Sequence, residues 1–323
     1  MRKFIGDIKD KIYKGLDITK DEAMALWRED TEELAIAADE IRRRMCGNGF
    51  DLCAIINGKS GRCSEDCKFC PQSCHHNAAI KEYPLLREEE ILADALKRRQ
   101  EGIKRYSVVT SGSRLRKEEV AAIARCYRQI KETTSLRLCG SFGLLTEEDY
   151  RILKKAGMER CHNNLETSRS FFPKICSTHS YDEKIAAIKA AKKAGMSLCS
   201  GGIIGLGEAP EDRIDMALTL RELKVSSVPI NVLNAIAGTP LEAQPPLNYD
   251  EIRRTVAVFR FILPEASLRL SGGRGLLADK GEALLKAGAN AAISGDMLTT
   301  AGISTEQDLI LLEGLGYEVK CDD

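Results

Sequence analysis

The sequence predicts a single domain of the α/β class, a (β/α)8 barrel of the TIM type with an N-terminal helical lead-in. Eight apolar runs have the length of strands, and helical patterns lie between nearly all of them. Several of these helices end with a basic residue and a glycine directly before the next apolar run. The 323 residues, 43% of them hydrophobic, would also suffice for two ordinary domains. The alternation of strands and helices favours one barrel.

The lead-in is expected over residues 1–45 and the barrel domain over 46–323. Thr19 and Glu22 have the spacing of a capping box, and the run ELAIAADEIRRRM carries apolar residues at helical intervals. Both features indicate helices before the first strand.

The barrel elements follow in order. We expect strands near 51–57, 104–110, 135–140, 159–164, 196–204, 226–232, 266–271 and 290–294. The clearest helical patterns between them lie at 87–100, 118–130, 147–155, 180–193, 210–223 and 248–263. Helix-to-strand joins are expected at Gly102, Gly157, Gly195 and Gly288, because glycine accepts the left-handed backbone that ends a helix.

The charge balance narrows the class of partner. Lys plus Arg and Asp plus Glu both number 48, so no global basic field would collect nucleic acid, and a small molecule is the better expectation. The N-terminal run MRKFIGDIKDKIYKG interrupts its apolar residues with charges, which is typical of neither a signal peptide nor a membrane span. We therefore expect a cytoplasmic protein with no membrane segment.

The cysteine content is high and unevenly distributed. Twelve cysteines in a chain without an export signal favour metal or redox chemistry over disulfides, because the cytosol keeps thiols reduced. One group crowds a short loop, whereas others sit singly in apolar, strand-like runs at Cys53, Cys139 and Cys199. Two sites are predicted, one formed locally and one formed by folding.

The local group has the spacing C-x3-C-x2-C, in GRCSEDCKFCPQSC, directly after the first predicted strand. Thiolates are soft ligands suited to iron-sulfur clusters, and Cys63, Cys67 and Cys70 can hold a four-iron cubane while leaving its fourth iron open to a small molecule. The alternative is a zinc knuckle, with Cys74, His75 or His76 as the fourth ligand. That spacing is uncommon for zinc, and the loop follows a strand end, where barrels place their active sites.

These motifs resemble a known family. The C-x3-C-x2-C run with Phe69 resembles the radical S-adenosylmethionine (SAM) signature, and INGKSGRCSEDCKFCPQS resembles its biotin synthase version. The resemblance continues through CHNNLETS, CSGGIIGLGE, VPINVLNAIAGTPL and SLRLSGGR, and covers roughly residues 30–310. It implies that a 4Fe-4S cluster cleaves SAM to a 5'-deoxyadenosyl radical, which abstracts hydrogen from dethiobiotin. Sulfur from an auxiliary iron-sulfur cluster is then inserted, which gives biotin.

The resemblance also implies residues that contact SAM. CSGGIIGLGE resembles the element that lies along the cofactor, although a plain strand-to-helix turn would read similarly. Glu166 matches a position near the ribose. His179 stands where the family has an arginine thought to pair with the SAM carboxylate, which leaves that contact open. The implied SAM-binding set is Phe69, Glu166, Gly201, Gly202, Gly205 and Glu208.

A further set is implied for dethiobiotin. Asn231 matches the position that hydrogen-bonds the ureido ring, and its amide suits the task because it offers both a donor and an acceptor to a urea. Asn164 matches a position near the substrate ring, and Thr299 and Thr300 match positions near the substrate carboxylate. Lys59 is expected to face the same carboxylate, with a surface lysine as the alternative.

The dispersed cysteines match the family's auxiliary cluster, with one departure. Cys139, Cys199 and Arg269 match ligand positions, but Ser107 stands where a cysteine is expected. Cys53 is predicted to replace it, because side chains of one interior barrel layer come from alternate strands. An ordinary buried thiol is the alternative. The family's usual 2Fe-2S cluster and a four-iron form are both compatible with this set.

Partners follow from the same resemblance. They are a flavodoxin- or ferredoxin-type electron donor and a second copy of the chain in a homodimer. Two other functions were weighed. One is a related barrel enzyme, such as a hydrogenase-maturation protein or a methylornithine synthase, and the other is a non-catalytic iron-sulfur or zinc scaffold.

Overall fold

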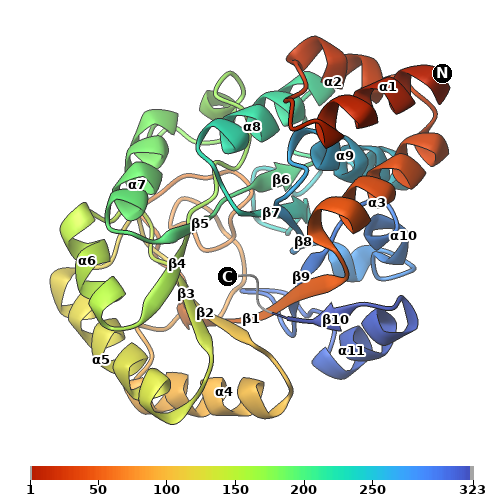
Figure 1. The fold of residues 1–323 in the computed structure, drawn as a ribbon. Coiled ribbons are helices and arrows are strands. Elements are labelled where there is room, and N and C mark those ends of the chain that lie inside the picture. The colour runs from red at the N-terminus through yellow and green to blue at the C-terminus, as the bar shows by residue number, and fades with distance from the viewer. Residues whose placement is uncertain (1, 321–323) are drawn as a thin grey trace.

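The strands close into a parallel barrel in the computed structural model, which describes residues 2–320 (Figure 1). The first strand pairs in parallel with both the second and the last strand of the ring, and this closes the sheet. The ring strands are β1 (Gly49–Lys59), β2 (Arg105–Thr110), β3 (Arg137–Ser141), β4 (Met158–His162), β5 (Ser197–Cys199), β6 (Gly202–Ile204), β7 (Ser227–Val232), β8 (Ser267–Leu270) and β9 (Ala291–Ser294). β5 and β6 share one position of the ring, so the predicted eight-position barrel is confirmed.

Helices surround the barrel as expected from the alternating pattern (Figure 1). They are α4 (Glu88–Gln100), α5 (Lys117–Thr133), α6 (Glu147–Lys155), α7 (Tyr181–Lys193), α8 (Pro210–Glu222), α9 (Tyr249–Ile262), α10 (Glu282–Leu285) and α11 (Thr305–Gly314). Two 3-10 turns lie at Phe172–Lys174 and Arg274–Leu276. The predicted joins at Gly102, Gly157, Gly195 and Gly288 all have positive φ, between 80° and 104°.

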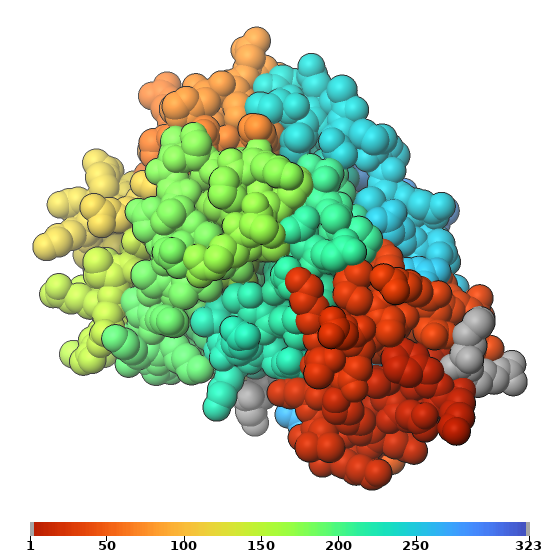
Figure 2. Space-filling view, turned by 90° about the horizontal axis from the view of Figure 1, so that it is seen from above, coloured from red at the N-terminus to blue at the C-terminus, as the bar shows by residue number. Residues whose placement is uncertain are grey.

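The lead-in forms three helices, α1 (Arg2–Tyr13), α2 (Lys20–Trp27) and α3 (Thr31–Cys46). The expected capping box is present, with Glu22 N donating to Thr19 Oγ1 at 3.2 Å and Thr19 N donating to Glu22 Oε2 at 2.7 Å. Arg254 of α9 donates to the carbonyl of Trp27 at 2.6 Å and ties α2 to the barrel helices. In Figure 2 these N-terminal helices, in red, gather at one corner of the molecule beside α8.

The structure corrects three details of the sequence prediction. The expected strand at 196–204 is interrupted at Ser200 and Gly201. A two-residue strand β10 (Glu318–Val319) pairs with the start of β1, and it is too short to give an apolar run. The helix α11 was also missed, because it has no distinct apolar face, whereas the helix implied by the join at Gly288 is present as the four-residue α10.

Alternate residues of each strand face the barrel interior, as strand geometry requires. On β1, Leu52 and Ala54 pack into the hydrophobic core beneath the helices, whereas Asp51, Cys53 and Ile55 do not belong to that core. Cys53 and Ile55 line an interior cavity instead. In the described part of the chain, no helix combines the length and the apolar character that a membrane crossing requires.

Candidate active site

A cavity of about 360 Å³ opens among the loops that follow the barrel strands. Residues from every part of the barrel line it, which is how the carboxyl ends of barrel strands commonly build a site. Several residues singled out in the sequence are brought together here, namely Phe69, Cys70, Asn164, Glu166, Asn231, Thr299 and Thr300.

Asn231 is held in a fixed orientation at the end of β7. Its Nδ2 donates to the carbonyl of Gly202 at 2.9 Å, and its Oδ1 accepts from Gly272 N at 3.0 Å. An amide has a second N–H and a second lone pair, so one donor and one acceptor remain for a ligand in the cavity.

Asn164 and Glu166 lie beside the glycine-rich segment after β5. Gly201 N donates to Asn164 Oδ1 at 3.1 Å, and Glu166 O accepts from Ile203 N at 2.9 Å. Glu166 has a φ of 72°, which is rare for a residue other than glycine and is held by these backbone contacts. Burial raises the pKa of its carboxyl group, and Lys184, which lines the same cavity, acts in the opposite direction.

The glycines of CSGGIIGLGE are required by close packing. A Cβ on Gly201 would lie 1.9 Å from the carbonyl oxygen of Pro229, and one on Gly202 would lie 2.4 Å from that of Glu166. Gly205 has a φ of 94°, and its N–H donates to Glu208 Oε1 at 2.8 Å. Glu208 also accepts a hydrogen bond from Arg213. It does not line the large cavity, so it stabilises the turn from the side away from that cavity.

Lys59 and His179 lie away from the cavity lining, and Gly201, Gly202, Gly205 and Glu208 of the glycine-rich segment do not line it either. Lys59 donates to Glu119 of α5 at 2.8 Å, and it is not among the residues that line the cavity. His179 contacts Glu65 at 2.6 Å and lines an outer groove.

The signature loop presents its cysteines near the cavity mouth. Cys63 N donates to Gln72 O at 2.9 Å and Cys74 N donates to Cys63 O at 2.8 Å, which folds the loop back on itself. The rings of His75 and His76 contact backbone carbonyls, at 3.0 and 2.8 Å. One ring nitrogen of each of these two imidazoles thus helps to hold the loop.

Cys67 is turned towards Cys176, which follows the first 3-10 turn. The Cys67 thiol donates to Cys176 at 3.7 Å, and Cys176 lies 3.3 Å from His179 Nδ1. The hydrogen bond from Cys67 is the main reason that the pKa of Cys176 falls to about 4, and the same contact raises the pKa of Cys67. Burial lowers the pKa of His179, but contacts with Cys176 and Glu65 outweigh it and leave that pKa raised.

A smaller interior cavity lies directly beneath the large one. Its volume is about 20 Å³, against about 360 Å³ for the large cavity, and the two share Ile55, His162 and Ile293 in their linings. Cys53, Cys139 and Cys199 all line the small cavity, as do Arg269 and Ser107. The expectation that these side chains lie together is therefore met, whereas their role as cluster ligands stays a prediction. Arg269 Nη1 donates to Cys53 Sγ at 3.1 Å.

These thiols are deeply buried. Burial raises the pKa of Cys53 to about 12 and that of Cys139 to about 11, so ionisation requires a compensating positive charge. The hydroxyl of Ser107 is buried without a hydrogen-bond partner in the same cavity.

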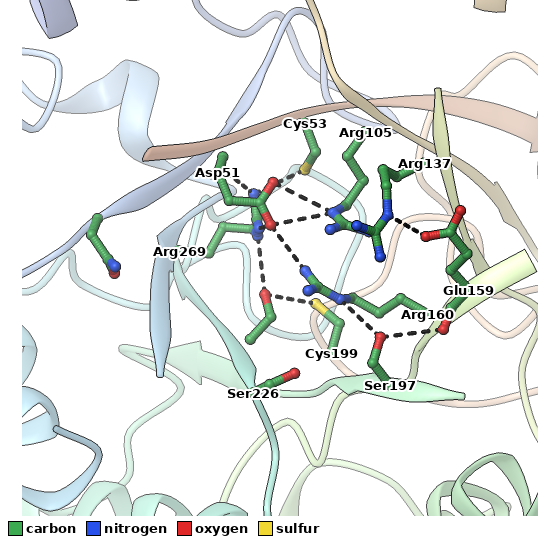
Figure 3. Close-up of polar contacts among 12 residues, drawn as sticks. Asp51, Cys53, Arg105, Arg137, Glu159, Arg160, Ser197, Cys199, Ser226 and Arg269 are labelled. Atoms are coloured by element: carbon green, nitrogen blue, oxygen red, sulfur yellow. Dashed lines mark hydrogen bonds and ion pairs between the residues drawn. The ribbon is translucent and has the colours of Figure 1, made fainter. Parts of the chain in front are cut away.

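An acid shared by three arginines forms the base of this cavity (Figure 3). Asp51 Oδ2 lies 2.8 Å from Arg269 Nη2, 3.2 Å from Arg105 Nε and 3.0 Å from Arg160 Nη1. Burial alone would raise the pKa of Asp51, but the three guanidinium charges outweigh it and lower the pKa to about 2. Within this group of four residues, positive charge outnumbers negative charge, which favours anionic ligands in the cavity above.

Sequence reasoning missed several of these residues. Asp51, Arg105 and Arg160 carried a signal, since charged residues inside apolar strand runs are unusual and must find partners. Cys176 carried no signal in the sequence, because only the fold brings it to the signature loop. Lys184 could not be singled out from the sequence, because α7 carries several basic residues.

Comparison with known proteins agrees with this geometry. Residues 59–220 match the Radical SAM superfamily, and residues 229–318 match the Biotin and Thiamin Synthesis associated domain. The biotin synthase of Clostridium botulinum is 57% identical over 311 residues, which cover 96% of this chain and 98% of that protein. The biotin synthase of Brachyspira hyodysenteriae is 52% identical over 316 residues, covering 98% and 95%.

The chain belongs to the biotin synthase family. Solved structures similar to this family member include methylornithine synthase, with a TM-score of 0.85, 21% identity and 97% coverage of each chain. The hydrogenase maturase HydG from Carboxydothermus hydrogenoformans has a TM-score of 0.82 at 17% identity, covering 97% of this chain and 78% of its own. At these identities the two show a shared fold alone.

The residues present fit the groups that biotin synthase family membership implies. The radical SAM match implies SAM and a 4Fe-4S cluster, and Cys70 of the signature loop lines a cavity with room for a small molecule. The family also implies an auxiliary iron-sulfur cluster. Three thiols converge with Arg269 on one enclosed cavity, and its surplus of guanidinium groups suits thiolate ligands.

Proposed function

We propose that this chain converts dethiobiotin to biotin by radical SAM chemistry, with sulfur supplied from within the barrel. One observation carries the proposal. A single cavity gathers the signature-loop residue Cys70, the polar groups Glu166 and Asn231, and the paired threonines, directly above a second cavity lined by three thiols.

Cys63, Cys67 and Cys70 would hold the 4Fe-4S cluster, beside which SAM binds. Together with an electron, that pair supplies a 5'-deoxyadenosyl radical, which removes hydrogen from the substrate. The chain contributes position and exclusion of water. Phe69 and Glu166 line the cavity and would contact the cofactor. From the segment around Gly201, Gly202 and Gly205, which Glu208 supports, Ile203 lines the cavity.

The substrate is oriented from the opposite side. Asn231 offers one donor and one acceptor to the ureido ring, and Asn164 lies near that ring. Thr299 and Thr300 offer hydroxyl groups to the carboxylate at the outer end of the cavity. Lys59 could reach that carboxylate only by leaving Glu119. This arrangement would hold the reacting carbons above the interior thiols.

The auxiliary cluster would be held by Cys53, Cys139 and Cys199, with Arg269 beside it. Support comes from their shared cavity and from Ser107, which occupies the strand position of the family's missing cysteine without the softness of a thiolate. Because this ligand set departs from the family pattern, a four-iron cluster is as compatible with it as the usual 2Fe-2S form.

The remaining assignments rest on the resemblance alone. A flavodoxin- or ferredoxin-type protein would supply the electron, and the chain would act as a cytoplasmic homodimer. We also describe residues 1–45 as an N-terminal extension and 46–323 as the barrel domain, because α3 ends at Cys46 and β1 begins at Gly49.

The test is anaerobic reconstitution, with iron and sulfide counted before dethiobiotin, SAM and a reductant are added. Biotin and 5'-deoxyadenosine should both form. Alanine at Cys63, Cys67 or Cys70 should abolish 5'-deoxyadenosine, because the cubane loses a protein ligand. Cys74→Ala is the matched control in the same loop and should cleave SAM nearly normally. Retained cleavage in all three ligand variants would exclude the radical SAM assignment.

A further inference from the structure

Two thiols face each other where the signature loop meets the segment after the first 3-10 turn. The Sγ atoms of Cys67 and Cys176 are 3.7 Å apart. Cys67 is partly exposed, whereas Cys176 is only 4% exposed, and neither residue lines the large cavity. The pair therefore lies outside the proposed substrate site, and the proposed function gives a role to Cys67 alone.

Hydrogen bonds on both sides of this thiol pair hold the two segments in register. On one side, Lys68 N donates to Ile175 O at 2.9 Å. On the other side, Ser177 N donates to Asp66 Oδ1 at 2.8 Å. The residues directly before and after each cysteine are thus joined to the opposite segment. The two cysteines consequently occupy facing positions, as a bond between their side chains requires.

The thiols are close to the separation of a disulfide. Sulfurs in a disulfide are about 2.05 Å apart, so closure requires an approach of about 1.7 Å. A change of side-chain rotamer moves a sulfur atom by more than this, so the two segments can stay where they are. Thr178 Oγ1 at 3.6 Å and His179 Nδ1 at 3.3 Å flank the sulfur of Cys176 and keep it beside Cys67.

We propose that Cys67 and Cys176 form a reversible disulfide when the signature loop holds no iron and the chain meets a hydroperoxide. With hydrogen peroxide, one sulfur attacks the O–O bond and becomes a sulfenic acid, which releases one water. The other sulfur then displaces the sulfenic hydroxyl group as a second water. Two thiols lose two electrons in total, and one peroxide is reduced to two waters. A thiol reductant reopens the bond by exchange.

The disulfide would act as a switch on cluster assembly. Cys67 is one of the three ligands proposed for the 4Fe-4S cluster, and only a thiolate can serve as that ligand. The oxidised chain therefore accepts no signature-loop cluster until it is reduced. The bond also keeps Cys67 from further oxidation to sulfinic acid, which thiol reductants do not reverse. This switch rests on the proposed function, whereas the disulfide itself does not.

The first test treats the full chain, freed of iron by a chelator, with one equivalent of hydrogen peroxide. The remaining thiols are alkylated, and a non-reduced digest is analysed by mass spectrometry. One crosslink should join the peptides of Cys67 and Cys176, and dithiothreitol should remove it. Because this measurement uses the unaltered chain, it does not depend on the folding of any variant. A crosslink from Cys67 to Cys63, Cys70 or Cys74 in its place would overturn the proposal.

The second test compares variants after treatment with excess hydrogen peroxide. In Cys176→Ser, Cys67 has no facing thiol, so the fraction of Cys67 recovered as sulfinic acid should rise at least about tenfold over wild type. Cys74→Ser is the matched control in the signature loop and should form the crosslink at the wild-type yield. Circular dichroism checks the folding of both variants. Equal amounts of sulfinic acid at Cys67 in Cys176→Ser and in wild type would contradict protection by the disulfide.

The third test measures cluster transfer from a loaded iron-sulfur scaffold protein, without added thiol or sulfide. The oxidised wild-type chain should gain no 4Fe-4S signal in electron paramagnetic resonance, whereas the same chain reduced with dithiothreitol and desalted should gain it. A crosslinked chain that accepts the cluster as readily as the reduced chain would overturn the switch. A chain that forms the reversible crosslink yet never cleaves SAM would support the disulfide and contradict only the proposed function.

Discussion

Asp51 contacts Arg105, Arg160 and Arg269 together, and its side chain is fully buried. Removing one partner of a buried ion pair leaves uncompensated charge, which costs far more than the loss of an exposed pair. The residue therefore holds the base of the interior cavity in place while leaving the guanidinium groups available to anions above.

Asp51→Asn is expected to lower the free energy of unfolding at pH 7 by about 3–5 kcal/mol, measured by urea denaturation. The matched control is Asp182→Asn, which removes the exposed partner of Arg169 and should cost less than about 1 kcal/mol.

The stabilisation by the Asp51 carboxylate is expected to depend on pH. The folded-state pKa of Asp51, about 2, is below the unfolded value, so its contribution to the free energy of unfolding is present above about pH 4 and is lost as the pH falls towards 2. The difference between wild type and Asp51→Asn should accordingly shrink in that window. A constant difference would contradict the charge-based explanation.

Asn231 is the residue on which substrate selection is expected to depend. Asn231→Ala removes the donor and the acceptor that face the cavity, which should cost about 1–3 kcal/mol for each ureido group left unpaired. The dissociation constant for dethiobiotin, measured by calorimetry on reconstituted protein, should rise by at least tenfold while iron and sulfide contents stay at wild-type levels. Unchanged affinity would mean that the ureido ring binds elsewhere.

At the scale of elements, the interruption between β5 and β6 depends on two adjacent glycines. A methyl group on Gly201 would overlap the backbone carbonyl of Pro229 on the neighbouring strand, and a backbone atom cannot move aside as a flexible side chain can. The interruption lets Gly201 N reach Asn164 and lets Gly202 O reach Asn231. One backbone irregularity thus orients both asparagines of the proposed substrate site.

Gly201→Ala should therefore destabilise the chain by about 1–3 kcal/mol or more and weaken dethiobiotin binding as well. Gly6→Ala in α1 is the control, since a Cβ there meets no atom within 4 Å. Alanine in a helix is favoured over glycine by about 1 kcal/mol, so the control should be neutral or stabilising. Thermal unfolding gives the melting temperatures of both variants. Equal melting temperatures would contradict the close-packing argument.

The elements differ in how far the sequence could predict them. The eight ring positions and the helices between them were predictable, because burial on both faces of a parallel sheet gives continuous apolar runs and each long helix has its own periodicity. The break at Ser200 and Gly201 was not, since CSGGIIG reads as one apolar run until the neighbouring strand is known. β10 depends on pairing with β1 across the whole chain, which local patterns do not encode.

At the scale of the whole molecule, the barrel brings residues separated by more than 200 positions to one cavity. Cys139, Cys199 and Arg269 could be grouped in advance from the family resemblance, and Cys53 could be added because alternate strands share interior layers. Asp51 and its arginines could not, because sequence patterns reveal a buried charge but not its partners. The contact between Cys67 and Cys176 was equally hidden, since it arises between two loops whose paths have no periodic signal.

Cys53→Ala tests whether Cys53 is a ligand of the auxiliary cluster. The variant should lose the iron and sulfide of the auxiliary cluster and form no biotin, yet should still cleave SAM through the signature-loop cluster. Cys161→Ala is the matched control, because Cys161 lies on β4 but packs into the helix-facing core beside Tyr150. Wild-type iron content and biotin formation in Cys53→Ala would show that Cys53 is only a packed thiol.

The stacking of the two cavities has a consequence for the order of events in each catalytic cycle. Among the described residues, strands wall the lower cavity, Asp51 and its arginines close it below, and Ile55, His162 and Ile293 separate it from the space above. Under the proposed function, iron and sulfide would reach the thiols from the upper chamber, which the substrate would fill later. Restocking and catalysis would then alternate: the thiols would be loaded first, the substrate would follow, and the product would depart before the next delivery.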